Sequence, residues 1–265
     1  MIPCQFGPDG QQRLGIYHAP RASVATDAAV VLCPPVGQEY MRTHRPLRQL
    51  ALALADAGLH VLRFDYHGTG DSAGVIGDAS LEGWIGDIAL AAAELADISG
   101  ASRVALVGLR TGALFAAAAC ARGVPGADRL VLWDPVVGGR DYLVEMQAMH
   151  AALARTMRPV PPVPSDEILG YPYPGPLRGA LAALDLVTLA GKLPAVRVDV
   201  LASEPRPEYR RLRAALVAAG RDGEFLEASE PGAWNDLPEA FNVMLASRTV
   251  QALAGLVAPP RGRAA

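Results

Sequence analysis

The chain lacks several features that would assign it to a specialised class of protein. Its 265 residues include only three cysteines, Cys4, Cys33 and Cys120, which are far apart and have no metal-ligand spacing. An odd, scattered set excludes a disulfide framework and favours a reducing compartment. No apolar run approaches the roughly 20 residues of a membrane span, and the first residues lack the basic start of a signal peptide. We therefore expect a cytoplasmic protein that does not bind membranes.

The chain also lacks an excess of charge of either sign. It has 24 basic and 27 acidic residues, a formal net charge of -3, which gives no electrostatic reason to expect a nucleic-acid partner. The glycines of 68–70 lack the spacing of a dinucleotide-binding loop, so we expect neither a cofactor nor a metal. With 51% hydrophobic residues the chain can bury the core of one domain over 1–265. The sequence is compatible with either a monomer or a homodimer.

Apolar runs alternate with segments of helical periodicity, which predicts an α/β fold with a mostly parallel sheet. A hairpin precedes this alternation, and a run such as 28–33 is typical of strands buried on both faces. Helices are expected from Pro46 to just before Gly58, and from Ser80, which can cap the next one. Strands are expected at 2–6, 12–17, 28–33, 60–65, 104–107, 129–135, 197–202 and 224–227, and later helices at 208–219 and from Asp236 to about 257.

The alternation is interrupted at about 138–194. A helix rich in Met and Leu over 142–157 leads into a proline cluster, and a second short helix is expected around 177–189. Flanking amphipathic helices favour an ordered insertion, a small helical lid over the sheet, rather than a linker. Its apolar side chains could line an acyl pocket or simply pack as core; they are Met146, Met149, Met157, Tyr171 and Tyr173.

The stretch from Val104 to Ala116 runs from an apolar strand through Gly108-x-x-x-Gly112 into an alanine-rich helix. This spacing indicates a tight strand-to-helix turn of the nucleophile-elbow type, in which the middle residue stands exposed above the sheet. Here the middle residue is Arg110, so the turn is present without a serine nucleophile.

The whole chain resembles the α/β-hydrolase superfamily in its order of elements. The Gly108-x-x-x-Gly112 turn resembles the elbow, and 65–72 resembles the Asp-x-x-Gly-x-Gly-x-Ser turn of the serine-aminopeptidase-like branch. The segment 33–37 stands where that branch has its oxyanion-hole loop. The resemblance implies an α/β-hydrolase fold with a doubly wound, mostly parallel sheet.

Within the superfamily the chain is most similar to one bacterial group, the second hydrolase that accompanies exosortase-A systems of exopolysaccharide producers. The similarity is carried by 34–40 with His44-Arg45, by Gly108-Leu109-Arg110 and by 169–172. It implies a role in bacterial biosynthesis and says little about activity, because the name of that group follows its fold.

An active member of the superfamily needs a nucleophile, an acid and a histidine in that chain order. Glu204 could supply the acid, and Asp134 at the end of the preceding strand is the alternative. The histidine should lie near 229–235, but the last histidine of the chain is His150. Two of the three triad positions are therefore predicted to be vacant.

Arg110 is the candidate that decides the function. It could bind an anionic group beside the oxyanion-type loop at Val36 and Gly37, or it could pair with Glu204 or Asp134 as a structural replacement for the triad. Further candidates are His44 as an acid or base and Thr111 and Tyr40 as substrate-binding residues. For His67, loop packing is the simpler interpretation.

Three functions are compatible with these residues. The first is an atypical protein that acts on or binds an acyl, ester or thioester compound or an anionic metabolite, free or carried on an acyl carrier, through Arg110. The second is a non-catalytic pseudohydrolase that binds a ligand or partner. The third is an ordinary hydrolase whose base is not recognisable in the sequence.

Overall fold

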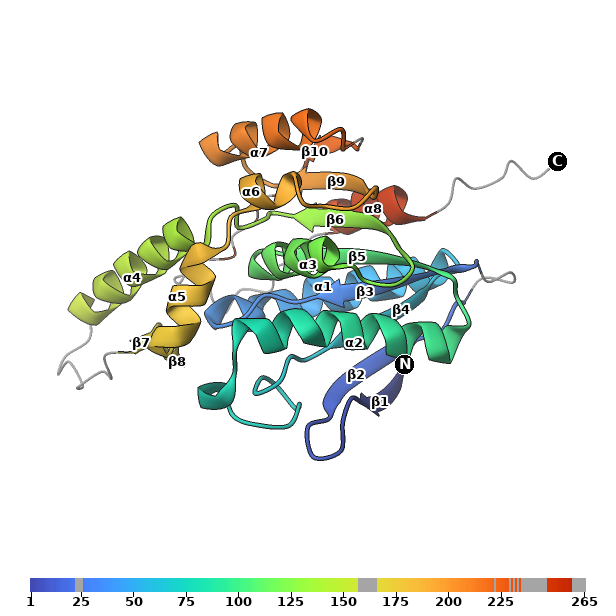
Figure 1. The fold of residues 1–265 in the computed structure, drawn as a ribbon, viewed down its shortest axis with the longest axis horizontal. Coiled ribbons are helices and arrows are strands. Elements are labelled where there is room, and N and C mark those ends of the chain that lie inside the picture. Colours follow the sequence, from blue (N-terminus) through green and yellow to red (C-terminus); the bar gives the residue numbers. More distant parts are fainter. Residues whose placement is uncertain are drawn as a thin grey trace.

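The computed structural model describes residues 1–21, 26–156, 166–221, 223–228, 230, 232, 234 and 247–258. Its centre is an eight-stranded sheet in the order β1-β2-β4-β3-β5-β6-β9-β10. The hairpin strands β1 and β2 are antiparallel to each other and β2 is antiparallel to β4, whereas all other neighbours are parallel. Parallel neighbours require crossovers, and helices supply them (Figure 1).

The strands of this sheet are β1 (Ile2–Phe6), β2 (Arg13–His18), β3 (Ala28–Cys33), β4 (His60–Phe64), β5 (Arg103–Leu109), β6 (Ala127–Trp133), β9 (Arg197–Ala202) and β10 (Phe225–Glu227). The helices outside the insertion are α1 (Gln38–Asp56), α2 (Leu81–Ser99), α3 (Thr111–Arg122), α7 (Pro207–Ala218) and α8 (Ser247–Val257), with the short 3₁₀ helix Ile76–Asp78. The expected strands are thus confirmed to within one or two residues.

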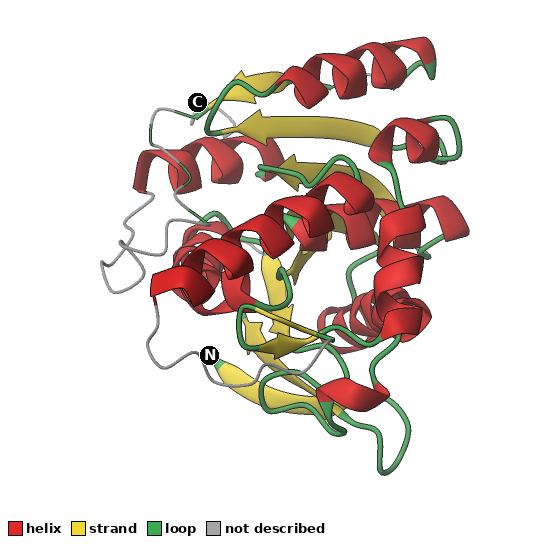
Figure 2. Cartoon of the chain, turned by 90° about the vertical axis from the view of Figure 1, so that its left-hand side faces the viewer, coloured by secondary structure: helices red, strands yellow, loops and turns green. Residues whose placement is uncertain are grey.

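Helices cover both faces of the sheet, as Figure 2 shows. Along β3, Ala29 and Val31 belong to the larger apolar cluster with α2, α3 and α7, whereas Val30 and Leu32 belong to the second cluster with α1 and α8. Side chains of a strand alternate between faces, so a strand covered on both sides must be apolar throughout. This explains why the run 28–33 contains no polar residue.

The start of α1 was predicted wrongly. The helix begins at Gln38, eight residues before the expected proline, and Pro46 lies in its interior. A proline inside a helix removes one backbone hydrogen bond and normally favours a helix start instead. Here Thr43, Pro46 and Leu47 are all buried, so packing of this face outweighs the local cost.

The insertion between β6 and β9 contains α4 (Gly139–Thr156), the short hairpin of β7 (Glu167–Ile168) and β8 (Tyr171–Pro172), α5 (Gly175–Ala183) and α6 (Leu186–Ala190). The expected helix around 177–189 is therefore two helices, separated by Leu184 and Asp185, and the Asp185 side chain caps α6. That the insertion works as a lid of a single domain stays a prediction. Met157, the proline cluster, the expected helix start at Asp236 and the C-terminal tail lie outside the described residues.

Candidate functional site

The elbow is present where the sequence predicts it. Arg110 follows β5 and precedes α3 with φ 55° and ψ −120°, a conformation that costs a residue other than glycine on the order of 1–3 kcal/mol. The flanking glycines make the turn sterically possible, because a Cβ at Gly108 would overlap the backbone of Ala113 and one at Gly112 would overlap the Cys33 carbonyl. The strained turn has therefore been kept although its central residue is an arginine.

The Arg110 side chain does not face solvent. Its Nε donates to Glu39 Oε1 at 3.0 Å, and Nη1 donates to the backbone carbonyl of Asp134 at 3.2 Å. Burial opposes the guanidinium charge, but the Glu39 carboxylate outweighs it, and the pKa of Arg110 lies above its usual value. Arg110 is thus fully charged, and the Glu39 carboxylate balances its charge inside the protein.

Two tyrosines of the insertion close the same site. The Tyr142 hydroxyl donates to Glu39 Oε2 at 3.4 Å, and it also contacts the Tyr173 hydroxyl. Burial and the Glu39 charge raise the pKa of both phenols. A Cβ at Gly37 would overlap the Tyr173 hydroxyl, so the oxyanion-type loop and the insertion are in direct contact.

Asp134 forms a second buried group beside the elbow. Its Oδ2 accepts from Trp234 Nε1 at 2.7 Å and from Ser203 Oγ at 2.6 Å, and its Oδ1 accepts from the Ser203 backbone at 2.5 Å. In a hydrolase triad the acid accepts an N–H from the catalytic histidine, which holds that ring in place. The ring N–H that Asp134 accepts here belongs to an indole, which can neither accept nor transfer a proton at its nitrogen.

The oxyanion-type loop is also satisfied internally. The backbone N–H of Val36 donates to Thr111 Oγ1 at 3.1 Å, and Val36 is buried. In the α/β-hydrolase arrangement, an N–H of this loop and the N–H of the residue after the nucleophile bind the oxyanion. One of the two expected donors is therefore already bound to a side chain of this protein.

The carboxylate that pairs with Arg110 is Glu39 rather than Glu204 or Asp134, which corrects the sequence-based expectation. Glu204 is exposed and forms no ion pair within the described part of the chain. Asp134 contributes its backbone carbonyl to Arg110, because its carboxylate oxygens are bound to Trp234 and Ser203. Glu39 reaches the arginine because α1 starts so early and places this residue in its first turn.

The remaining candidates divide between separate cavities. A cavity of about 100 Å³ is lined by Arg110, and one of about 10 Å³ by Arg110, Asp134 and Trp234, which leaves room for at most a single water molecule. A third cavity, of about 230 Å³, lies along Val36, Gly37 and Tyr40. His44 lines none of these: it faces a cavity of about 360 Å³ on the other side of Tyr40, whose lining does not include Arg110.

Sequence reasoning missed two residues, Glu39 and Trp234. Both stand inside segments that the motifs single out, Glu39 after the oxyanion-type loop and Trp234 where a histidine was sought. The signal for Glu39 was an acid close to the carboxyl end of β3, opposite an arginine at the elbow.

No group of His, Cys, Asp and Glu among the described residues could hold a metal ion. Nor does any helix in the described part of the chain have the length and apolarity to cross a bilayer.

Comparison with known proteins agrees with this architecture. A family model described as serine aminopeptidase, S33, matches residues 25–167. None of the curated proteins matches the chain significantly. Among solved structures, DcsB, determined in complex with its substrate analogue, has a TM-score of 0.65 at 18% identity and covers 97% of both chains.

Two enzymes of known type have the same fold. A thermostable carboxyl esterase from Bacillus coagulans, in complex with glycerol, has a TM-score of 0.64 at 14% identity, covering 97% of this chain and 98% of its own. A proline iminopeptidase from Mycobacterium smegmatis has a TM-score of 0.60 at 16% identity, covering 96% and 98%. Identities this low establish the α/β-hydrolase fold and nothing about activity.

Proposed function

The chain belongs to the serine aminopeptidase S33 family, and from the way its elbow is filled we propose that it is a non-catalytic member, a pseudohydrolase that binds a ligand or partner. The observation that carries this proposal is the ion pair of Arg110 with the buried Glu39. A guanidinium cannot act as the acyl-accepting nucleophile, and one held in a buried pair is not available as a proton donor or acceptor.

Two further contacts support the proposal. Trp234 donates to Asp134 where a hydrolase would present its histidine, and Thr111 Oγ1 accepts the Val36 N–H where a hydrolase would bind an oxyanion. Nucleophile, base and one oxyanion donor are therefore each replaced or occupied. Loss of one such group leaves residual catalysis in serine hydrolases, but the combination removes both the attacking group and its activation.

Binding of an anionic or acyl substrate by Arg110 is the rival proposal. The neighbouring cavity of about 100 Å³ does contain Arg206, but Asp141, Glu145 and Glu208 line it as well. With Glu39 already neutralising the guanidinium, these carboxylates would repel an anion. We therefore favour the pseudohydrolase, and retain membership of the exosortase-A-associated group, cytoplasmic location and a role in bacterial biosynthesis as parts of the proposal.

The test is activity-based labelling of the purified protein. We expect no labelling by a fluorophosphonate probe and no hydrolysis of p-nitrophenyl butyrate above a heat-denatured control. Stoichiometric labelling at any serine, or turnover that the probe abolishes, would overturn the proposal. Native mass spectrometry after incubation with cell extract then identifies what the scaffold binds. A ligand released chemically altered would favour the rival.

A further inference from the structure

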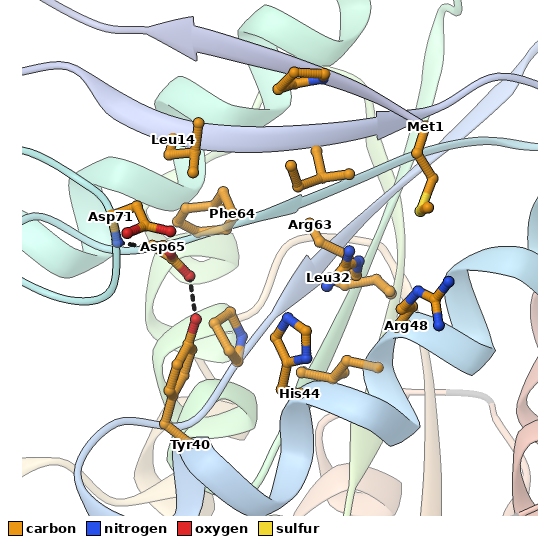
Figure 3. A pocket seen from close by; sticks show the side chains of 14 residues that line it. Met1, Leu14, Leu32, Tyr40, His44, Arg48, Arg63, Phe64, Asp65 and Asp71 are labelled. Carbon is orange, nitrogen blue, oxygen red and sulfur yellow. Dashed lines mark hydrogen bonds between the residues drawn. The ribbon is translucent and has the colours of Figure 1, made fainter.

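One cavity near the carboxyl edge of the sheet lies outside the elbow, because Arg110 does not line it. It has a volume of about 360 Å³ and lies between α1 and the strands β2 and β4 (Figure 3). Its walls are largely apolar and include Leu14, Ile16, Leu32, Leu47 and Phe64. A concave, mostly apolar space of this size with a few polar groups is the usual form of a small-molecule site.

Three basic side chains gather at this cavity. His44 and Arg48 stand one turn apart on α1, and Arg63 comes from β4. They are close enough to affect one another: burial lowers the pKa of His44, the charges of Arg63 and Arg48 lower it further, and Asp65 opposes this shift. Burial also lowers the pKa of Arg63, and Arg48 acts in the same direction, whereas Tyr40 and Asp65 act in the opposite direction. Like charges held together in this way are stabilised by a bound anion.

Arg63 is held by a neutral acceptor instead of a carboxylate. Its Nε donates to His18 Nε2 at 3.3 Å. Burial, followed by the charge of Arg63, lowers the pKa of His18 to about 4, so the imidazole is uncharged at neutral pH and can accept this bond. The contact positions the guanidinium without neutralising it, and its terminal nitrogens make no hydrogen bond or ion pair within the described ranges.

One carboxylate of the cavity, that of Asp65, already accepts two hydrogen bonds. Asp65 accepts from the Tyr40 hydroxyl at 2.5 Å and from the Asp71 backbone at 3.1 Å. In Figure 3, Asp65 and Asp71 lie at one end of the cavity, whereas Arg63 and Arg48 lie at the other. Neither arginine forms an ion pair with any described residue.

We infer that this cavity binds an amphipathic anion, with a carboxylate or phosphate head between Arg63 and Arg48 and a short alkyl chain along Leu14, Ile16 and Leu47. A guanidinium presents parallel N–H groups that match either head group. The inference is independent of the elbow, because Arg110 does not line this cavity. It adds to the pseudohydrolase proposal a place and a chemical class for a ligand.

The experiment is isothermal titration of the full chain, at low salt and pH 7, with octanoate and with octyl phosphate. Acetate and inorganic phosphate serve as head-only controls, and octanol as the tail-only control. We expect at least one amphipathic anion to bind at least tenfold more tightly than its head alone and than octanol. The tighter of the two anions identifies the head group. Equal binding of octanol, or no binding of either anion at millimolar concentration, would overturn the inference.

Two variants locate the site. Arg63→Met removes the charge and keeps an unbranched side chain, and we expect about a tenfold or greater loss of affinity, as for one charged hydrogen bond. Ile16 lies directly opposite Arg63 across β2 and β4, so Ile16→Glu would supply an internal carboxylate that competes for the guanidinium. It should weaken binding to a similar extent even if Arg63→Met folds poorly.

Arg45→Gln is the matched control, because Arg45 is exposed on the same helix and does not line the cavity. Its affinity should stay within twofold of the parent protein. Unchanged affinity in a folded Ile16→Glu variant, or an equal loss in Arg45→Gln, would show that the anion binds elsewhere and would overturn the inference.

Discussion

Arg110 and Glu39 form an ion pair with Nε and Oε1 3.0 Å apart, and their side chains are only 3% and 0% exposed. Two charges removed from water in this way are costly, and their mutual attraction repays that cost only while both are present. The pair connects the elbow to the first turn of α1, and Tyr142 extends the connection to the insertion. It therefore joins three parts of the chain that are distant in sequence.

The first prediction concerns this pair. Arg110→Met should lower the free energy of unfolding by about 3–5 kcal/mol, because it leaves Glu39 buried without a counter-charge. The double variant Arg110→Met/Glu39→Gln should recover much of that loss. Urea unfolding followed by circular dichroism measures both. A double variant no more stable than the single one would show that the arginine acts through packing rather than charge.

The second prediction concerns the proposed loss of the triad. Arg110→Ser/Glu39→Gln should remain unreactive toward a fluorophosphonate, because no base accompanies the new serine. Adding Trp234→His should produce measurable labelling, since Asp134 is already placed to accept the imidazole N–H. The further change Asp134→Asn is the control and should reduce labelling. Labelling of the variant without the histidine would contradict this assignment of positions.

The third prediction concerns pH. Burial, followed by the charge of Arg63, lowers the pKa of His18 from the ordinary histidine value of 6.5 to about 4 in the folded protein, so the unfolded chain binds this proton more readily. The stability contributed by neutral His18 is complete above pH 6.5 and is lost as the pH falls toward 4, by on the order of 3 kcal/mol. His18→Asn, which retains an acceptor for Arg63, should lose less stability between pH 7 and pH 4.5. Parallel losses in denaturant melts of the two proteins would refute this role.

The fourth prediction concerns the insertion. Tyr142 and Tyr173 are buried against Glu39, so amides of α4 near Tyr142 and of α5 should exchange slowly with solvent. Tyr142→Phe removes one hydrogen bond to the carboxylate and should raise exchange there more than in α2. Hydrogen exchange with mass spectrometry measures this. An unprotected insertion in the parent protein would mean that it is a linker and not a lid.

Most of the fold could be predicted from the sequence because the strands are buried on both faces. The run at β3 is apolar throughout, as burial on both faces requires, and it coincides with the observed strand. The bounds of β9 coincide as well, although that strand contains the buried Asp199, which pairs with Arg197. The elbow could also be predicted from the sequence, since close backbone contacts require glycine at positions 108 and 112. The start of α1 was not, because the burial of Thr43 and Leu47 that stabilises it around Pro46 is a tertiary effect.

The position of the candidate site could be predicted from the sequence, but the side chains that pair with Arg110 and Asp134 could not. Glu39, Arg110 and Trp234 come from three separate parts of the chain, and only the fold brings them together. Local pattern gave Glu204 and Asp134 as partners for Arg110, because both follow strands at the same edge of the sheet. Which carboxylate an arginine reaches depends on where helices start and on which acceptors are already bound, as for Asp134.

Tyr40 has a consequence for the size of molecule that this protein can accept. Its ring lines both the cavity of about 360 Å³ beside Arg63 and the cavity of about 230 Å³ beside Val36, and its hydroxyl is tied to Asp65. The two cavities are therefore neighbours that share the Tyr40 side chain in their lining. While the Tyr40 hydroxyl is hydrogen-bonded to Asp65, each cavity limits the length of the ligand that it can hold. A ligand long enough to reach from one cavity into the other would have to displace the Tyr40 ring and break its hydrogen bond to Asp65.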